Sequence, residues 1–238
     1  MATPSDKLAA SLARLQALQA DGRRVFASGE LPRIHRERLR KQGFLCPVIK
    51  GWYIGTGPDA GTEDRTPWHA SFWEFCARHC ESRFGANWHL SPEQSLLLHA
   101  ETSVIPAQVV VYSPKGTNNT LALPFGTSLY DLKHKQSPPA ADLGVKDGLR
   151  IFAPAAALTR VPEDFFMRHP VDMQVALASI RDPSEVLSRL LAGGHSAIAG
   201  RLAGAFRRIG RNDFADQIVK TMKGAGYDVQ ESDPFAAR

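Results

Sequence analysis

The stretch LPRIHRERLRKQG carries basic side chains at a spacing that suits recognition of DNA. Arg33, Arg36 and Arg40 are three and four residues apart, so they share one face if the stretch is helical. An arginine can donate two hydrogen bonds to the edge of a guanine in the major groove. The pattern therefore predicts a recognition helix over Leu31–Gln42 in which these three arginines face the bases.

The segment after this helix, FLCPVIKGWYI, predicts a β-hairpin. Strands are expected at Leu45–Ile49 and Trp52–Ile54, with Lys50 and a glycine at the turn. An amphipathic helix is expected earlier, over Ser5–Asp21, because leucines recur there at spacings of three and four. Helix, short turn, basic helix and hairpin is the order of a winged helix, whose hairpin tip reaches the DNA backbone. We therefore expect Lys50 to contact phosphate.

Four more basic residues belong to the predicted interface. They are Arg23, Arg24, Arg38 and Lys41. Arg38 and Lys41 are expected to contact phosphates, while the arginine pair lies where the first helix gives way to the second and is expected to touch the DNA backbone there. Within the basic helix, Ile34 and Leu39 are expected to face inward.

The charge distribution agrees with a basic N-terminal module. The chain has 238 residues and a formal net charge of +5. Residues 1–56 carry ten Lys or Arg and four Asp or Glu, whereas residues 57–238 carry 19 and 20. Lysine and arginine release counterions when they neutralise phosphates, so a basic module on a near-neutral body is typical of a nucleic-acid reader. A solvated basic face is the alternative explanation.

The cysteines offer a second kind of chemistry. In CARHC, Cys76 and Cys80 are four residues apart with His79 beside them, and two thiolates with one imidazole are ligands that zinc accepts. A structural zinc site normally draws on a second ligand pair, and no second cysteine pair exists in the sequence. We therefore expect buried, unreactive thiols, no metal and no cofactor. Cys46 is expected to be a small core residue.

Enzymatic signatures are absent from the sequence, so we expect a protein with no catalytic residues. There is no phosphate-binding loop of the GxxxxGK[ST] type, no HExxH, no GxSxG and no dinucleotide fingerprint. The carboxylate pair Asp182 and Glu185 stands at an expected helix start, where acids complement the helix dipole. His99 is expected to be a packed residue at a helix end. Arg201, Arg207, Arg208 and Arg211 are expected to form a solvated helix face, with a second nucleic-acid contact as the alternative.

The fold class expected is α+β, in three parts. We place a winged helix-turn-helix in residues 1–56, a linker in 57–67, a mixed α/β domain in 68–160 and a helical domain in 161–238. In the mixed domain, AQVVVYS and LALP are expected to pair as a hairpin across SPKGTNNT. Further strands are expected at Thr127–Leu132 and Leu149–Phe152. Helices are expected at 68–79, after Ser91, and at 155–159, 171–180, 183–192, 196–209 and 212–223.

The combined pattern resembles the AbiEi-type antitoxin and transcriptional-regulator family. The residues that carry this resemblance are RERLRKQGFLCPVIKGWYIG and HLSPEQSLLLHAETSVIPAQVVVYSPKG, within about Leu8–Tyr112. Ala100 stands where the family usually has glycine after the histidine. The resemblance implies a winged helix followed by a mixed domain. It also implies a repressor of its own operon that binds double-stranded DNA and is partnered with a toxin.

The C-terminal region is similar to the segment before the Fic domain in some long bacterial Fic-family proteins. The resemblance rests on GYDVQESDPF, where the family has GY-x-V-x-E-x-x-P-F. The Fic catalytic motif H-x-F-x-[D/E]-G-N-x-x-R and the inhibitory [S/T]-x-x-x-E-[G/N] motif are both missing. The alternative function is therefore a non-catalytic interaction module for a Fic-family AMP transferase or a nucleotidyltransferase toxin.

A cytoplasmic protein without a membrane segment is expected. Three cysteines do not make a disulfide framework, and MATPSDKLAASLARLQALQA has no signal-peptide pattern. The longest apolar runs fall far short of the roughly 20 residues needed to cross a bilayer.

The predicted recognition helix has a direct test. Replacement of Arg36 and Arg40 by alanine is expected to weaken binding to one operator by about 1–3 kcal/mol for each arginine that reads a base, because each bidentate pair is removed. Fluorescence anisotropy with a labelled operator duplex measures this, and unchanged affinity would contradict the assignment.

Overall fold

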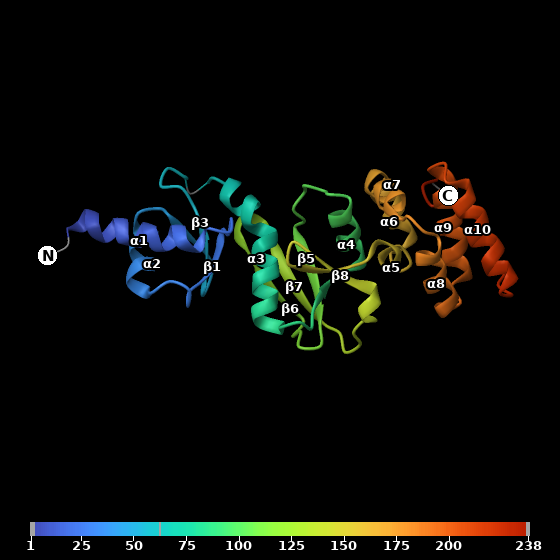
Figure 1. Cartoon of the computed structure of the whole chain (residues 1–238), viewed down its shortest axis with the longest axis horizontal. Coiled ribbons are helices and arrows are strands. Elements are labelled where there is room, and N and C mark those ends of the chain that lie inside the picture. The colour runs from blue at the N-terminus through green and yellow to red at the C-terminus, as the bar shows by residue number, and fades with distance from the viewer. Residues whose placement is uncertain (1–2, 62, 237–238) are drawn as a thin grey trace.

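A computed structural model describes residues 3–61 and 63–236. The expected mixture of helices and strands is confirmed. The chain forms an elongated molecule, with the N-terminal helices at one end and the C-terminal helices at the other (Figure 1). None of the helices in the described ranges has the length and apolar composition that a bilayer crossing demands.

The N-terminal unit contains two helices and a three-stranded antiparallel sheet. Its elements are α1 (Pro4–Leu18), β1 (Val25–Ala27), α2 (Arg33–Lys41), β2 (Leu45–Ile49) and β3 (Trp52–Gly55). The hairpin β2–β3 is confirmed, but β1 lies in the stretch expected to be a turn, where it pairs with β3 to give the order β1-β3-β2. A strand of three residues is too short to show alternating apolar and polar side chains in the sequence. Strand β1 is therefore recognised only from its pairing with the distant β3.

The central unit is a four-stranded sheet with helices around it. It comprises α3 (Thr66–Phe84), β4 (His89–Leu90), α4 (Pro92–His99), β5 (Gln108–Ser113), β6 (Asn119–Ala122) and β7 (Ser128–Lys133). The predicted helix at 68–79 is confirmed and is longer at both ends. Helix α4 begins as predicted, with Ser91 as its cap accepting a hydrogen bond from the Gln94 amide.

The predicted hairpin between AQVVVYS and LALP is wrong. The sheet order is β4-β5-β7-β6, so β7 lies between these strands, parallel to β5 and antiparallel to β6. The buried Asp131 carboxylate of β7 fixes the loop between β5 and β6, since it accepts hydrogen bonds from the backbone N–H groups of Thr117 and Asn119. A β-carbon on Gly116 would come 2.7 Å from the Leu132 carbonyl oxygen, so only glycine fits where this loop passes β7.

A short hairpin leads from the sheet into the C-terminal helices. It consists of β8 (Leu143–Lys146) and β9 (Leu149–Phe152), of which β9 matches the predicted strand. The helices are α5 (Pro154–Leu158), α6 (Glu163–Arg168), α7 (Pro170–Ser179), α8 (Ser184–Gly193), α9 (Ser196–Arg208) and α10 (Asn212–Gly224). Five of the six follow the predicted ranges, and only the short α6 was not predicted.

Three hydrophobic clusters hold these units together. Leu15, Leu39 and Leu45 belong to a small cluster between α1, α2 and β2. The second cluster surrounds α3, and the third fills the space between α5–α10, α4 and the end of β9. Val25 and Ile54 of the N-terminal sheet belong to the second cluster, so this sheet is packed directly on α3.

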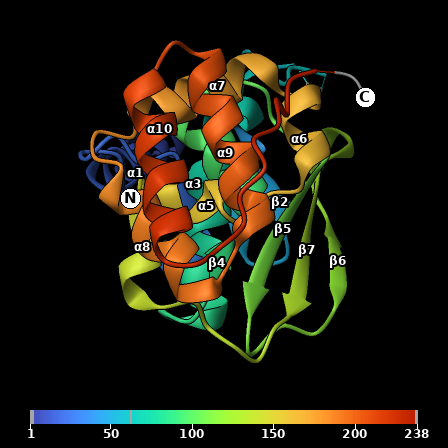
Figure 2. The same ribbon diagram turned by 90° about the vertical axis from the view of Figure 1, so that its right-hand side faces the viewer.

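The last segment of the chain runs along α9 (Figure 2). A β-carbon on Gly200 would lie 1.9 Å from the Gln230 carbonyl oxygen, and one on Gly204 would lie 2.0 Å from that of Ser232. The small residues of α9 therefore make room for an extended segment, and alanine at either position would displace it.

Of the four C-terminal arginines expected on a solvated face, Arg207 and Arg208 are exposed, whereas Arg201 and Arg211 are half-buried. Arg207 binds Glu231 of the last segment at 2.5 Å and Asp216 of α10 at 2.8 Å, while Arg208 lies 3.8 Å from Asp233. Arg201 and Arg211 donate hydrogen bonds to backbone carbonyls of Val161 and of the end of α7. Arg201, Arg207 and Arg211 therefore connect segments of the C-terminal unit.

His79 of α3 is buried at the junction with the N-terminal sheet. Its ring stacks on Phe75, with centroids 5.4 Å apart, and meets the ring of Trp52 edge-on at 5.8 Å. Neither ring nitrogen has a hydrogen-bond partner among the described residues. Burial, and then the charge of Arg83, lower the pKa of His79 below its ordinary value of 6.5, while Asp131 opposes them.

The stability of the protein is expected to fall as the pH falls through about 6.5 towards 5. Because the pKa of His79 is lower in the folded chain, the unfolded chain takes up the proton first, which favours unfolding. Burial lowers the pKa of His89 and His99 as well, so they act in the same direction. Thermal melts at pH 7 and pH 5 should show a smaller loss in His79→Phe than in the parent. His69→Phe, at an exposed position of the same helix, is the control, and an equal loss in all three would contradict this account.

Candidate nucleic-acid interface

The exposed face of α2 carries Arg33, Ile34, Glu37, Arg40 and Lys41. The helix begins after a proline, ends at Lys41 and is followed by Gly43 in the left-handed conformation (φ +76°) that ends helices. The opposite face is held by Leu39, which is fully buried against α1 and β2. This packing fixes which side chains of α2 are available to a partner.

Ile34 is 62% exposed, so the expectation that it faces inward is wrong. Five residues separate it from Leu39, and five residues turn an α-helix by about 140° beyond one full turn. The two side chains cannot share a face, and the fully buried Leu39 determines which of them enters the core. An apolar side chain is left among the exposed cations.

Two of the predicted DNA-binding arginines are used inside the N-terminal unit. Arg36 Nη1 donates hydrogen bonds to the carbonyl oxygens of Ser28 (2.5 Å) and Leu31 (3.1 Å), and its guanidinium lies over the ring of Tyr53. Arg38 Nη1 donates to the Lys7 carbonyl oxygen (2.7 Å) and to Ser11 Oγ (2.8 Å), both on α1. These arginines therefore fix α2 against the preceding turn, β3 and α1.

Arg24 and Glu30 join the N-terminal unit to α3. Arg23 Nη2 lies 2.9 Å from the Glu30 carboxylate, which also binds Arg78 of α3 at 2.9 Å. The pKa of Glu30 is lowered, since the backbone hydrogen bond from Ala27 and the two arginines outweigh its desolvation. The Arg24 backbone N–H and side chain bind Glu74 and the Ala70 carbonyl oxygen of α3.

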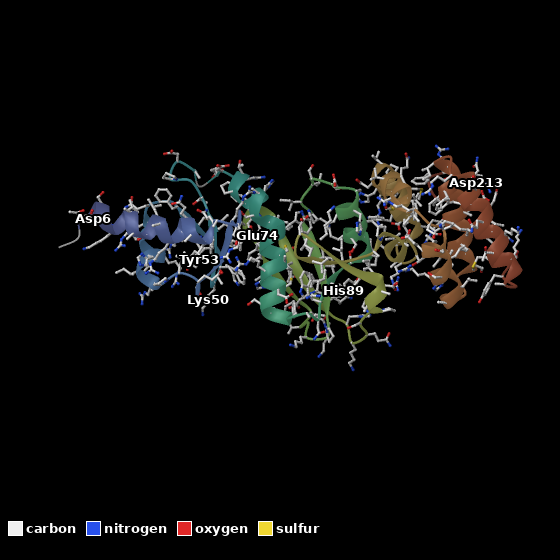
Figure 3. The ribbon with its side chains drawn as sticks, viewed as in Figure 1. Asp6, Lys50, Tyr53, Glu74, His89 and Asp213 are labelled. Atoms are coloured by element: carbon white, nitrogen blue, oxygen red, sulfur yellow. The ribbon has the colours of Figure 1, made fainter. Side chains whose placement is uncertain are left out.

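Of the eight predicted cations, Arg33, Arg40, Lys41 and Lys50 are exposed, and their side chains make no hydrogen bond or ion pair outside α2 and the hairpin in the described part of the chain. Lys50 stands at the β2–β3 turn (Figure 3), where Gly51 has φ +86°. Arg33 is paired with Glu37 at 2.6 Å, and this pair raises the pKa of Arg33 and lowers the pKa of Glu37. Both side chains are more than half exposed, so the pair is weak and open to exchange for a phosphate. Among the described residues, the side chains of Arg40, Lys41 and Lys50 have no hydrogen bond or ion pair partner.

Arg14 is a further exposed cation near α2 that the sequence analysis did not include. Its charge, after burial and together with that of Arg38, lowers the pKa of His35 on α2. His35 in turn lies 3.0 Å from Ser11 of α1. Arg14 is seven residues after Lys7, which places both on one face of α1. This spacing is the sequence signal that could have indicated Arg14 as part of a basic face.

Cys76 and Cys80 lie on α3, apart from this face. Cys76 and Cys80 are fully buried, and burial raises the pKa of both thiols far above the neutral range. Across residues 3–61 and 63–236, no three His, Cys, Asp or Glu side chains are grouped as a metal site requires. Cys46 is exposed on β2, so the expectation that it is a core residue is wrong.

His99 is packed as predicted, with Nε2 2.8 Å from the Phe152 carbonyl oxygen.

The structure separates the effects of two arginines of α2. Arg36→Ala is expected to lower the free energy of unfolding by about 1–3 kcal/mol, because two hydrogen bonds to carbonyl oxygens are removed. Arg40→Ala is expected to change it by less than about 0.5 kcal/mol, since the side chain is exposed and unpaired in the described part of the chain. Urea denaturation measures both values, and equal effects would contradict the division between supporting and exposed arginines.

A search of protein-family models finds no match to this chain, and a search of curated proteins finds none either. The resemblances to the AbiEi and Fic families therefore stay predictions.

Proposed function

We propose that the N-terminal unit is a winged-helix module that binds double-stranded DNA, in a cytoplasmic transcriptional regulator of the AbiEi antitoxin type that represses its own toxin–antitoxin operon. The observation that carries this proposal is the exposed face of α2. It presents three cations and one carboxylate around a protruding isoleucine, and a hairpin with Lys50 at its tip follows.

The proposed docking assigns each exposed side chain a different task. Helix α2 enters the major groove, where Arg33 and Arg40 donate to guanine edges. Ile34, which is 62% exposed, packs against a thymine methyl group. Lys41 and Lys50 neutralise phosphates on either side of the groove, which sets the register and makes binding depend on salt.

The second candidate is an interaction module for a Fic-family or nucleotidyltransferase toxin. It is favoured by two features. Arg23, Arg24, Arg36 and Arg38 are committed to internal contacts, which leaves fewer cations for DNA. On α7, Val171 and Val175 are 70% and 45% exposed one helical turn apart, as a protein-binding surface would require.

DNA binding is tested by fluorescence anisotropy with a labelled duplex from the region upstream of the gene and a scrambled duplex, each at about 50 and 200 mM salt. Preference for the upstream duplex that persists at the higher salt is expected. The variant Lys41→Gln/Lys50→Gln should weaken binding to both duplexes and reduce the salt slope by about 2, because two side chains no longer neutralise phosphates.

The matched control is Lys220→Gln/Lys223→Gln, which removes the same charge from exposed positions of α10. It should leave affinity and salt slope unchanged. Equal binding to both duplexes that disappears at 200 mM salt would reject sequence-specific regulation and favour the interaction module.

A further inference from the structure

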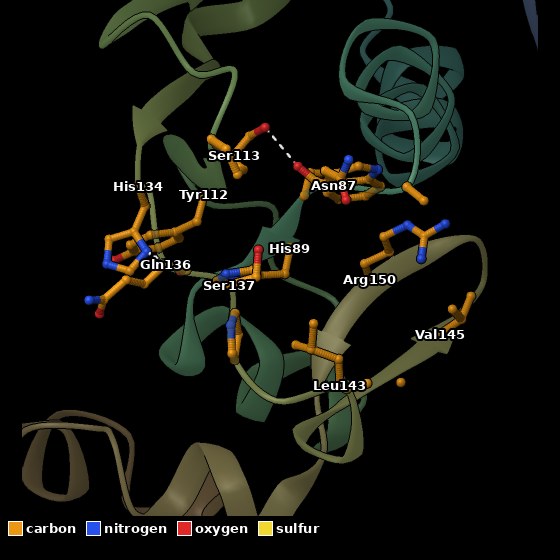
Figure 4. A pocket seen from close by; sticks show the side chains of 16 residues that line it. Asn87, His89, Tyr112, Ser113, His134, Gln136, Ser137, Leu143, Val145 and Arg150 are labelled. Carbon is orange, nitrogen blue, oxygen red and sulfur yellow. Dashed lines mark hydrogen bonds between the residues drawn. The ribbon is translucent and has the colours of Figure 1, made fainter.

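A pocket lies beside the central sheet, far along the chain from α2. Its volume is about 310 Å³, and it is bounded by the start of β4, the end of β5, the segment after β7 and the β8–β9 hairpin. A second cavity of about 350 Å³ shares His89, Tyr112, His134, Gln136, Ser137 and Pro138 with it. Figure 4 shows Tyr112, His134 and Gln136 on one side of the pocket and Arg150 on the opposite side.

Aromatic rings form one wall of the pocket. The rings of His89 and Tyr112 are parallel with centroids 5.2 Å apart, and His134 meets Tyr112 edge-on at 5.8 Å. His134 is exposed, so its ring is accessible from the pocket. Planar rings of this kind bind a flat heterocycle by stacking.

The two histidines also offer hydrogen-bond acceptors. His89 Nδ1 lies 2.9 Å from the Leu90 carbonyl oxygen, and His134 Nδ1 lies 2.6 Å from that of Gln136. A carbonyl oxygen only accepts, so each Nδ1 carries the proton and each neutral ring keeps Nε2 as an acceptor. An exocyclic amino group of a nucleobase is a donor that fits such an acceptor.

The charge of the pocket favours an anion. None of the described residues that line either cavity is Asp or Glu, whereas Arg150 lines the first and Arg160 the second. Arg160 is bound to Asp142 at 2.6 Å, but Arg150 has only a long 3.5 Å contact with the half-exposed Glu81, and its Nε has no partner among the described residues. The exposed Lys133 and Lys135 flank His134 in sequence. Arg150 is therefore the guanidinium available to a phosphate.

We propose that this pocket binds a nucleotide, with the base against Tyr112 and His134 and the phosphate on Arg150. Free mononucleotides and an unpaired nucleotide of a single strand share this chemistry. The site is separate from the proposed DNA-binding face and does not require it, because none of its lining residues lies in the N-terminal unit.

Isothermal titration calorimetry of the full chain tests the proposal with AMP, adenosine and the single strand dA12. AMP or dA12 is expected to bind with a dissociation constant below about 1 mM, and adenosine at least about fivefold more weakly than AMP because it lacks the phosphate. Arg150→Gln and His134→Ala should each weaken binding at least about fivefold. His134 is exposed, so its variant keeps the test valid if a change at Arg150 disturbs the fold.

Arg168→Gln is the control, since Arg168 is exposed on α6 and lines neither cavity. Binding of AMP identifies a free nucleotide as ligand, and binding of dA12 alone identifies a strand; both outcomes support the proposal. Absence of saturable binding up to about 5 mM AMP and about 0.5 mM dA12 would overturn it. Equal affinity of the parent, Arg150→Gln and His134→Ala would overturn it as well. Lys41→Gln/Lys50→Gln, which should weaken duplex binding, is expected to bind AMP like the parent. Absence of duplex binding by the parent would reject the DNA proposal without affecting the nucleotide pocket.

Discussion

The burial of α3 is the constraint on which the rest of the structure depends. Trp68, Phe72 and Phe75 are fully buried between the N-terminal sheet on one side and the central sheet with β9 on the other. Burying large aromatic side chains is the strongest contribution that individual residues make to a core. One helix supplies aromatic side chains to both neighbouring sheets. The N-terminal unit is therefore not an independently moving domain on a flexible linker. Its position is fixed by the same cluster that holds the central sheet.

The arginines around α3 and α2 show how a basic module divides its charge. Arg24 donates to the Ala70 carbonyl oxygen of α3, Arg23 shares Glu30 with Arg78 of α3, and Arg36 and Arg38 hold α2 in place. A guanidinium has five donors in a fixed fork, so one side chain can satisfy several backbone carbonyls that would otherwise be unpaired. The net charge of the N-terminal unit therefore overestimates the number of cations that can bind phosphate. Only the exposed cations on α2 and its hairpin are available for this.

Chemistry-bearing residues elsewhere are assembled from distant segments. His89 of β4, Tyr112 of β5 and His134 just after β7 are brought together by the antiparallel pairing of β4 with β5 and the parallel pairing of β5 with β7. Arg150 comes from β9 of the separate β8–β9 hairpin. Distant segments also meet at the C-terminus, where Gly200 and Gly204 leave room for the backbone of residues 230 and 232. A hairpin in place of the parallel pair would separate these residues.

Local sequence determined most of the secondary structure. Caps, glycines and apolar spacing placed α4, α9, α10 and the β2–β3 hairpin, because those signals act within one or two turns of chain. Tertiary structure decided what no local signal encodes. Packing buries Leu39 and leaves Ile34 exposed, and it places β7 between β5 and β6. Strand β1 exists only through its pairing with β3, and tertiary contacts determine which arginines bind carbonyl oxygens and which face solvent. The deciding partner lies in another element or turn in each case, from Ser28 beside Arg36 to Ile54 opposite Val25, so the choice exists only once these parts of the chain have packed together.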